Sequence, residues 1–104
     1  DDDGFIIYES RAICRYLADK FPNQGPKLMP TDPKKKAIFE QAASVEITNF
    51  DTYASRAVAE MVFKPRRGLT PDQAVFDNLI IELGKRLDAY DVILSKQRYT
   101  AGDV

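Results

Sequence analysis

The chain has 104 residues, enough for one domain with a single core, and its apolar (44%) and charged (30%) fractions are those of a soluble globular protein. Its formal charge of −1 argues against nucleic acid or an anionic membrane as the main partner. The absence of histidine and the presence of only one cysteine, Cys14, exclude Ser-His-Asp and Cys-His catalysis, the usual zinc sites and internal disulfides. We therefore predict no catalytic residue and no metal site in this chain, and the lone thiol suits a reducing, cytoplasmic compartment.

The N-terminal residues predict one turn and one strand. Asp3-Gly4 is typical of a type I′ hairpin turn, and the apolar run Phe5–Tyr8 predicts a buried strand. A hairpin needs a strand before its turn, yet only Asp1 precedes the turn, and an isolated strand cannot satisfy its own backbone hydrogen bonds. We interpret the sequence as a fragment that begins in the middle of a sheet.

Glu9 and Ser10 stand where the predicted strand meets the first helix. Ser10 is a favoured N-cap, and the free N–H groups and positive dipole end of a helix start can hold a carboxylate or phosphate. Glu9 adds a negative charge that can hold an ammonium group. The turn therefore suits the carboxylate and amine of one amino acid, although Ser10 could also serve only as a helix cap.

The first helix is predicted from about Arg11 to about Phe21, because apolar residues recur there every four positions and Pro22 ends the pattern. Within it, Cys14 is expected to be an ordinary, half-buried thiol. Three prolines and a glycine between Asn23 and Pro33 then predict a linker or domain boundary.

A second, long helix is predicted from Pro33 to around Phe63, with Asp32 as its N-cap. Apolar residues recur along it at intervals of three and four, and the weak helix formers at 49–52 predict a bend. Phe50 lies in this stretch and, from its residue type alone, is more often a core residue than a ligand contact.

A third helix is predicted to start with Thr70 as N-cap, Pro71 at the first position and Gln73 completing a capping box, and to end near Leu94. Gly84 inside this helix predicts a close contact with another helix. Two amphipathic helices each leave one flank uncovered, so we expect further helices or a partner subunit to cover them.

Four stretches carry a resemblance to a known family: Phe5–Phe21, Leu28–Pro33, Lys64–Pro71 and Tyr99–Asp103. In order and spacing they resemble the cytosolic glutathione transferases, most closely the phi-like group. The resemblance implies a mainly α chain that is a fragment of the α/β thioredoxin-like plus all-α helical architecture of that family. Residues 1–22 would end the thioredoxin-like domain, 23–32 would form the linker, and 33–104 would begin the helical domain.

The resemblance also implies roles for residues. Glu9 and Ser10 would bind the γ-glutamyl end of glutathione, and Phe50 would face the hydrophobic substrate. The parent protein would be a cytoplasmic homodimer that conjugates glutathione to small hydrophobic electrophiles, with its catalytic hydroxyl upstream of Asp1. Two alternatives stay open: a non-catalytic module of the same fold for binding or scaffolding, and a purely helical interaction domain without a ligand.

Overall fold

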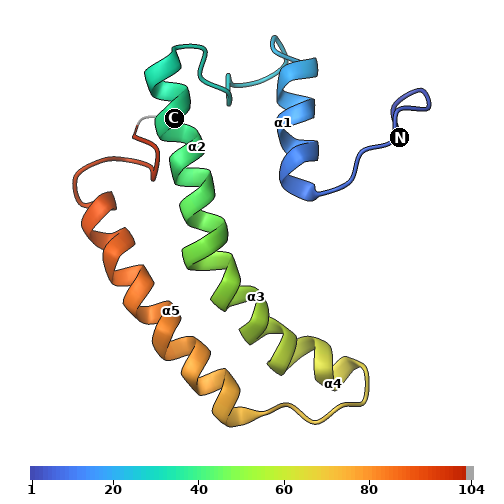
Figure 1. The fold of residues 1–104 in the computed structure, drawn as a ribbon, viewed down its shortest axis with the longest axis vertical. Helices are drawn as coiled ribbons and strands as arrows, with labels where there is room; N and C mark the ends of the chain where they lie inside the picture. Colours follow the sequence, from blue (N-terminus) through green and yellow to red (C-terminus); the bar gives the residue numbers. More distant parts are fainter. Residues whose placement is uncertain (103–104) are drawn as a thin grey trace.

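A computed structural model describes residues 1–102 as helices joined by turns, and no strand forms within them (Figure 1). The last two residues, including Asp103 of the fourth family-like stretch, lie outside the described part. The α-helices are α1 (Ser10–Lys20), α2 (Pro33–Val45), α3 (Thr52–Val58), α4 (Lys64–Arg66) and α5 (Gln73–Leu94). Two π-helical turns, η1 (Glu46–Asp51) and η2 (Ala59–Phe63), join α2 to α3 and α3 to α4. The mainly helical prediction is confirmed.

The elements from α2 to α4 form one continuous helical rod, which confirms the predicted long second helix. The predicted bend at 49–52 falls on η1, where the helix widens into a π turn and changes direction between α2 and α3 (Figure 1). The rod ends at Arg66, one residue after Pro65. Proline lacks the N–H that bonds to the carbonyl four residues earlier and crowds that carbonyl, and the turn before Pro65 is the π turn η2. Gly68 then adopts a φ of 73° and donates its N–H to the Pro65 carbonyl at 3.0 Å, which closes the helix end.

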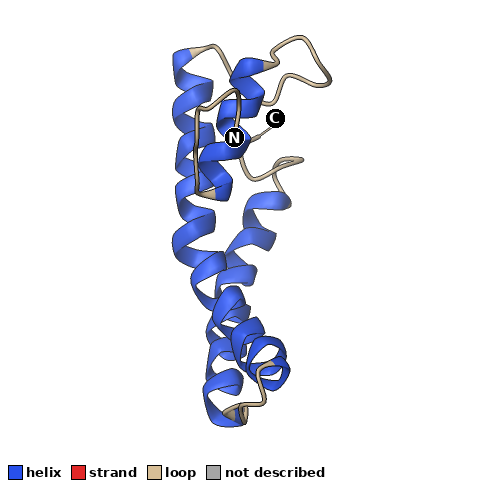
Figure 2. Cartoon of the chain, turned by 90° about the vertical axis from the view of Figure 1, so that its right-hand side faces the viewer, coloured by secondary structure: helices blue, strands red, loops and turns tan. Residues whose placement is uncertain are grey.

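Helix α5 runs back along the rod and packs on α3 and on the adjoining η1 and η2 (Figure 1). Their contact buries two apolar side chains, Ala57 at 4% exposure and Leu79 at 7%. The molecule is a thin slab of 46 × 43 × 19 Å, and Figure 2 shows it edge-on. The uncovered helix flanks are therefore as predicted. Gly84, however, has no atom within 4 Å of the place where a Cβ would stand, so the predicted close helix contact is wrong for this chain.

The helix starts show one confirmed and one wrong prediction. Asp32 caps α2 as predicted, because its Oδ1 accepts a hydrogen bond from the Lys35 N–H at 2.9 Å. Thr70 does not cap α5; Asp72 does, and its Oδ1 accepts from the Val75 N–H at 3.0 Å. The aspartate is the stronger cap of the two, and it has the extended backbone of an N-cap residue.

The N-terminal turn is confirmed and the strand after it is wrong. The two central residues of turn 2–5 have φ of 50° and 89°, and its ends exchange backbone hydrogen bonds of 2.9 and 3.0 Å. Residues 6–9 continue without regular structure, with Ile6 75% and Tyr8 81% exposed. A strand needs a neighbouring strand for its backbone groups, and residues 1–102 offer none. Within the same residues, no helix is both long and apolar enough to cross a membrane.

Candidate functional site

The turn from Glu9 into α1 is built differently from its prediction. Glu9 is the N-cap residue, and Ser10 is already the first helical residue. The Glu9 carbonyl accepts the first helical hydrogen bond, from the Ile13 N–H at 2.9 Å. The Ser10 side chain makes no capping hydrogen bond, so the predicted N-cap role of Ser10 is wrong. The reason is the backbone of Glu9, which takes the non-helical conformation that a cap residue requires.

That conformation is itself unusual. Glu9 has φ 72° and ψ 110°, a positive φ that residues with a side chain seldom adopt. Such strained residues concentrate at ligand sites, where the surrounding structure holds them in place. The observed backbone therefore singles out Glu9 independently of its charge.

The start of α1 offers several unused hydrogen-bond donors. The backbone N–H groups of Ser10, Arg11 and Ala12 precede the first helical hydrogen bond, and the Ser10 hydroxyl does not cap them. Glu9 and Ser10 are both exposed. Together with the positive end of the helix dipole, these donors can bind a carboxylate, while the Glu9 carboxylate can accept from an ammonium group.

Arginines on α1 connect this turn to the helical rod, a feature that the sequence did not reveal. The Arg11 guanidinium donates to both oxygens of Glu46, at 2.8 and 2.9 Å, and its Nη2 lies 3.2 Å from Asp51. The hydrogen bonds to Glu46 are the main cause that raises the pKa of Arg11. One helical turn further on, Arg15 pairs with Glu40 at 3.0 Å. Ion pairs between segments 25–40 residues apart leave no local pattern that could predict them.

A hollow of about 510 Å³ lies between α1 and α2. Its lining is mostly apolar and includes Ser10, Cys14, Met29, Phe39, Ala43 and Thr100. Cys14 is exposed, so its predicted half-burial is wrong, because it faces this open hollow instead of packing closely against α2. Ser10 thus stands at the edge of a space that can accept an apolar group.

Phe50 is not among the residues that line this hollow. It lies on η1, where it directly precedes Asp51 in the sequence, and it is 39% exposed. The structure therefore brings Glu9 and Ser10 together but does not add Phe50 to them. A substrate contact of Phe50 stays a prediction.

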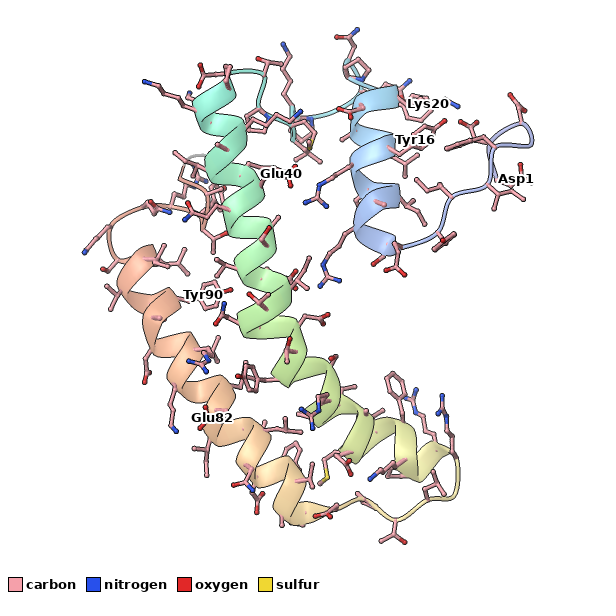
Figure 3. All side chains as sticks on the ribbon, in the orientation of Figure 1. Asp1, Tyr16, Lys20, Glu40, Glu82 and Tyr90 are labelled. Carbon is pink, nitrogen blue, oxygen red and sulfur yellow. The ribbon has the colours of Figure 1, made fainter. Side chains whose placement is uncertain are left out.

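A second polar cluster fixes the N-terminal turn onto α1. Tyr16 and Lys20 both lie on α1 (Figure 3). The Tyr16 hydroxyl donates to the Asp2 carboxylate, and Lys20 pairs with the same carboxylate. Lys20 is the main cause that lowers the pKa of Asp2, and Asp2 in turn raises the pKa values of Tyr16 and Lys20. The Phe5 and Tyr16 rings pack with centroids 5.4 Å apart. These contacts fix the N-terminal turn, residues 2–5, against α1.

Comparison with known proteins gives relatives along nearly the whole chain, although no protein-family model matches. Glutathione S-transferase PM239X14 of Arabidopsis thaliana is 47% identical over 105 residues, which cover 99% of this chain and 48% of that protein. Glutathione S-transferase hmp2 of Hypomyces subiculosus is 43% identical, covering 99% of the chain and 50% of the relative. The crystal structure of glutathione transferase F7 from Populus trichocarpa superimposes with a TM-score of 0.92 at 34% identity, covering 100% of this chain and 49% of that one. The chain thus spans about half the length of the relatives it matches.

The helical fold and these similarities agree: over nearly its whole length, the chain is similar to about half of a glutathione S-transferase. Its plant relatives are phi-class glutathione S-transferases, which confirms the resemblance predicted from the sequence.

Proposed function

We propose that this chain is part of a glutathione transferase that conjugates the thiol of glutathione to small hydrophobic electrophiles. Its own contribution is to bind the γ-glutamyl end of glutathione at Glu9 and Ser10. The observation that carries the proposal is the exposed, uncapped start of α1 beside the strained Glu9. The relatives named glutathione S-transferases, which are about twice as long as this chain, support it.

The γ-glutamyl group carries a carboxylate and an ammonium on one carbon, and the turn offers a partner for each. The carboxylate accepts hydrogen bonds from the Ser10 hydroxyl and from the free N–H groups of the first turn of α1. The ammonium donates to the Glu9 carboxylate. The rest of the tripeptide then leads away from the turn.

The chemistry itself needs a further group. A free thiol has a pKa of about 8.5, and a hydroxyl that donates to the sulfur favours the thiolate nucleophile at neutral pH. We propose that this hydroxyl belongs to a segment upstream of Asp1, so that these residues bind and position glutathione without activating its thiol. Phe50 would contact the hydrophobic substrate. Residues 1–22 would complete the glutathione-binding domain, 23–32 the linker and 33–104 the start of the helical domain of a cytoplasmic homodimer.

The test uses the full-length protein that contains this chain. Ser10→Ala removes one hydroxyl donor to a charged group, worth about 1.5–3 kcal/mol, so we expect glutathione to bind about 10–100-fold more weakly and retention on immobilised glutathione to fall. Ser44→Ala is the matched control, because the Ser44 hydroxyl donates only to the Glu40 carbonyl of its own helix, at 2.8 Å. Retention unchanged by Ser10→Ala would contradict the proposal.

Ser10→Asp separates the ligand role from a purely structural one. Aspartate is tolerated at helix starts, where its charge complements the dipole, so a structural role predicts an intact protein with unchanged affinity for glutathione. A ligand role predicts lost binding, because the new carboxylate repels the γ-glutamyl carboxylate. Retention of glutathione without conjugation of any electrophile would instead identify the non-catalytic binding module.

A further inference from the structure

The loop between α4 and α5 is fixed at both ends and open in the middle. On its N-terminal side, the Leu69 N–H donates to the Lys64 carbonyl at 2.9 Å. On its C-terminal side, the Asp72 N–H donates to the Glu60 carboxylate at 3.0 Å. Thr70 lies between these two hydrogen bonds and is exposed, and Figure 1 shows the loop at the opposite end of the slab from α1. The chain therefore presents Thr70 on a surface remote from the candidate site.

The Thr70 hydroxyl is not used at the start of the neighbouring helix, because Asp72 caps α5 in its place. Pro71 follows Thr70 directly, and its ring disfavours helical backbone at the preceding residue. Residues 69–72 accordingly form neither helix nor turn. An exposed hydroxyl in a non-helical segment, directly followed by proline, is the pattern that proline-directed Ser/Thr protein kinases recognise.

Two arginines shortly precede this hydroxyl. Arg66 ends α4 and Arg67 follows it, four and three residues before Thr70, and both are exposed. Lys64 pairs with Glu60 at 2.6 Å, whereas the described residues form no ion pair that includes either arginine. Both guanidinium groups are therefore available to an anion, and their paired N–H donors match the oxygens of a phosphate.

We propose that Thr70 is a phosphorylation site of a proline-directed protein kinase, and that Arg66 and Arg67 bind the resulting phosphate. In the reaction the Thr70 Oγ1 forms a bond to the γ-phosphorus of a nucleoside triphosphate, while the bond from that phosphorus to the bridging oxygen of the β-phosphate breaks. The nucleoside diphosphate leaves, and the hydroxyl proton passes to the catalytic aspartate of the kinase. The site goes beyond the proposed function, because none of its residues belongs to the glutathione site.

The arginines, and not the start of α5, are the partners of this phosphate. A phosphothreonine carries a charge of about −1.5 to −2 at pH 7, so positive neighbours stabilise it. The first turn of α5 already holds the Asp72 carboxylate, which accepts from the Val75 N–H at 3.0 Å and repels a second anion. The hydrogen bond from Leu69 to Lys64 folds the loop back onto the last turn of the rod, beside both arginines. Phosphorylation thus ties the loop to the end of the rod.

The first test is phosphorylation of the full-length protein by two proline-directed kinases, one mitogen-activated and one cyclin-dependent, with magnesium ATP. Peptide mass spectrometry should locate a phosphate on Thr70 in the wild type and on the serine of Thr70→Ser. Thr70→Val should lose it, and Pro71→Ala should lose most of it. Thr31→Val is the matched control and should be phosphorylated at Thr70 like the wild type, because Thr31 is also exposed in a proline-rich loop but is followed by Asp32. Failure of both kinases to modify Thr70, or modification of Thr31 at the same rate, would overturn the proposal.

The second test measures the arginines by phosphorus NMR of the phosphorylated full-length protein. The phosphate should lose its last proton at a pH about 0.5 lower in the wild type than in the double variant Arg66→Gln/Arg67→Gln, because nearby positive charge favours the dianion. Arg56→Gln is the control and should titrate like the wild type, since Arg56 is exposed on α3, outside the loop. Equal titration of the wild type and the double variant would refute phosphate binding by the arginines. Ser10→Ala should leave phosphorylation of Thr70 unchanged, so this proposal and the proposed function fail independently.

Discussion

We expect that the isolated 104-residue chain does not fold cooperatively as a monomer in dilute solution, because its exposed surface is too large for its mass. The chain exposes 8104 Å² at 11.8 kDa. A compact monomer of that mass exposes about 5,900 Å². Its radius of gyration is 17.4 Å, whereas a compact domain of this length has about 13 Å.

The missing burial can be converted into an approximate free energy. The excess is about 2,200 Å², of which somewhat over half is apolar on an ordinary protein surface. At 25 cal/mol per Å² the unburied apolar part corresponds to an upper estimate of about 30 kcal/mol, which exceeds the 5–15 kcal/mol net stability of typical domains. Ala57 and Leu79 are the two core residues among those described, and they cannot replace this contribution.

The assay is urea unfolding followed by far-UV circular dichroism, repeated over about a hundredfold range of protein concentration with sedimentation to measure mass. We expect either a broad, non-cooperative loss of helix, or a transition whose midpoint rises with concentration as copies cover each other's apolar flanks. The full-length protein is the control and should unfold cooperatively. A sharp, concentration-independent transition of a monomer would refute the reasoning.

Three further predictions concern α5 and its neighbours, the first in the 104-residue chain and the other two in the full-length protein. Gly84→Ala should stabilise α5 in this chain by about 1 kcal/mol, seen as a higher helix content by far-UV circular dichroism, because alanine is the better helix former and its Cβ meets no atom here; a lower helix content would contradict the open space found at Gly84. Asp72→Ala should lower the free energy of unfolding by about 1 kcal/mol through loss of the cap, and Asp72→Asn should cost less; equal losses would show that the cap hydrogen bond is unimportant. The pKa of Glu60 is lowered from its ordinary value of 4.5, first by Lys64 and then by the Asp72 N–H, so its stabilising effect is present above pH 4.5 and is lost as pH falls through the lowered pKa. The urea midpoint should therefore fall more steeply below pH 4.5 in the wild type than in Glu60→Gln, and parallel curves would exclude this role.

Features determined by neighbouring residues were predictable from the sequence. The turn at 2–5 follows from Asp3-Gly4, because these residues tolerate positive φ, and the start of α2 follows from Asp32-Pro33. The two ends of α5 were not predicted equally well. Its C-terminus at Leu94 was predicted, but its start shifted from Thr70 to Asp72, since two residues of the same loop could serve as the cap.

Features that depend on distant residues were not predictable. The apolar run at 5–8 fits a strand, yet pairing requires a second strand that no local pattern can supply. The partners of Arg11 lie 35 and 40 residues further along the chain. They also share one helix face only because η1 is a π turn, whereas helical periodicity read at 3.6 residues per turn separates Glu46 from Asp51.

The displaced start of α1 links these observations to the site. As an N-cap, Ser10 would accept a hydrogen bond from a backbone N–H group of the helix's own first turn with its side-chain oxygen. As the first helical residue, it leaves those N–H groups unpaired, so they can bind a carboxylate together with the hydroxyl, which can donate in either position. The cap position passes to Glu9 at the cost of a positive φ, and the arginine that follows Ser10 is held by the π turn of the rod. A shift of one residue thus turns a helix start that satisfies itself into one whose exposed N–H groups are available to an anion.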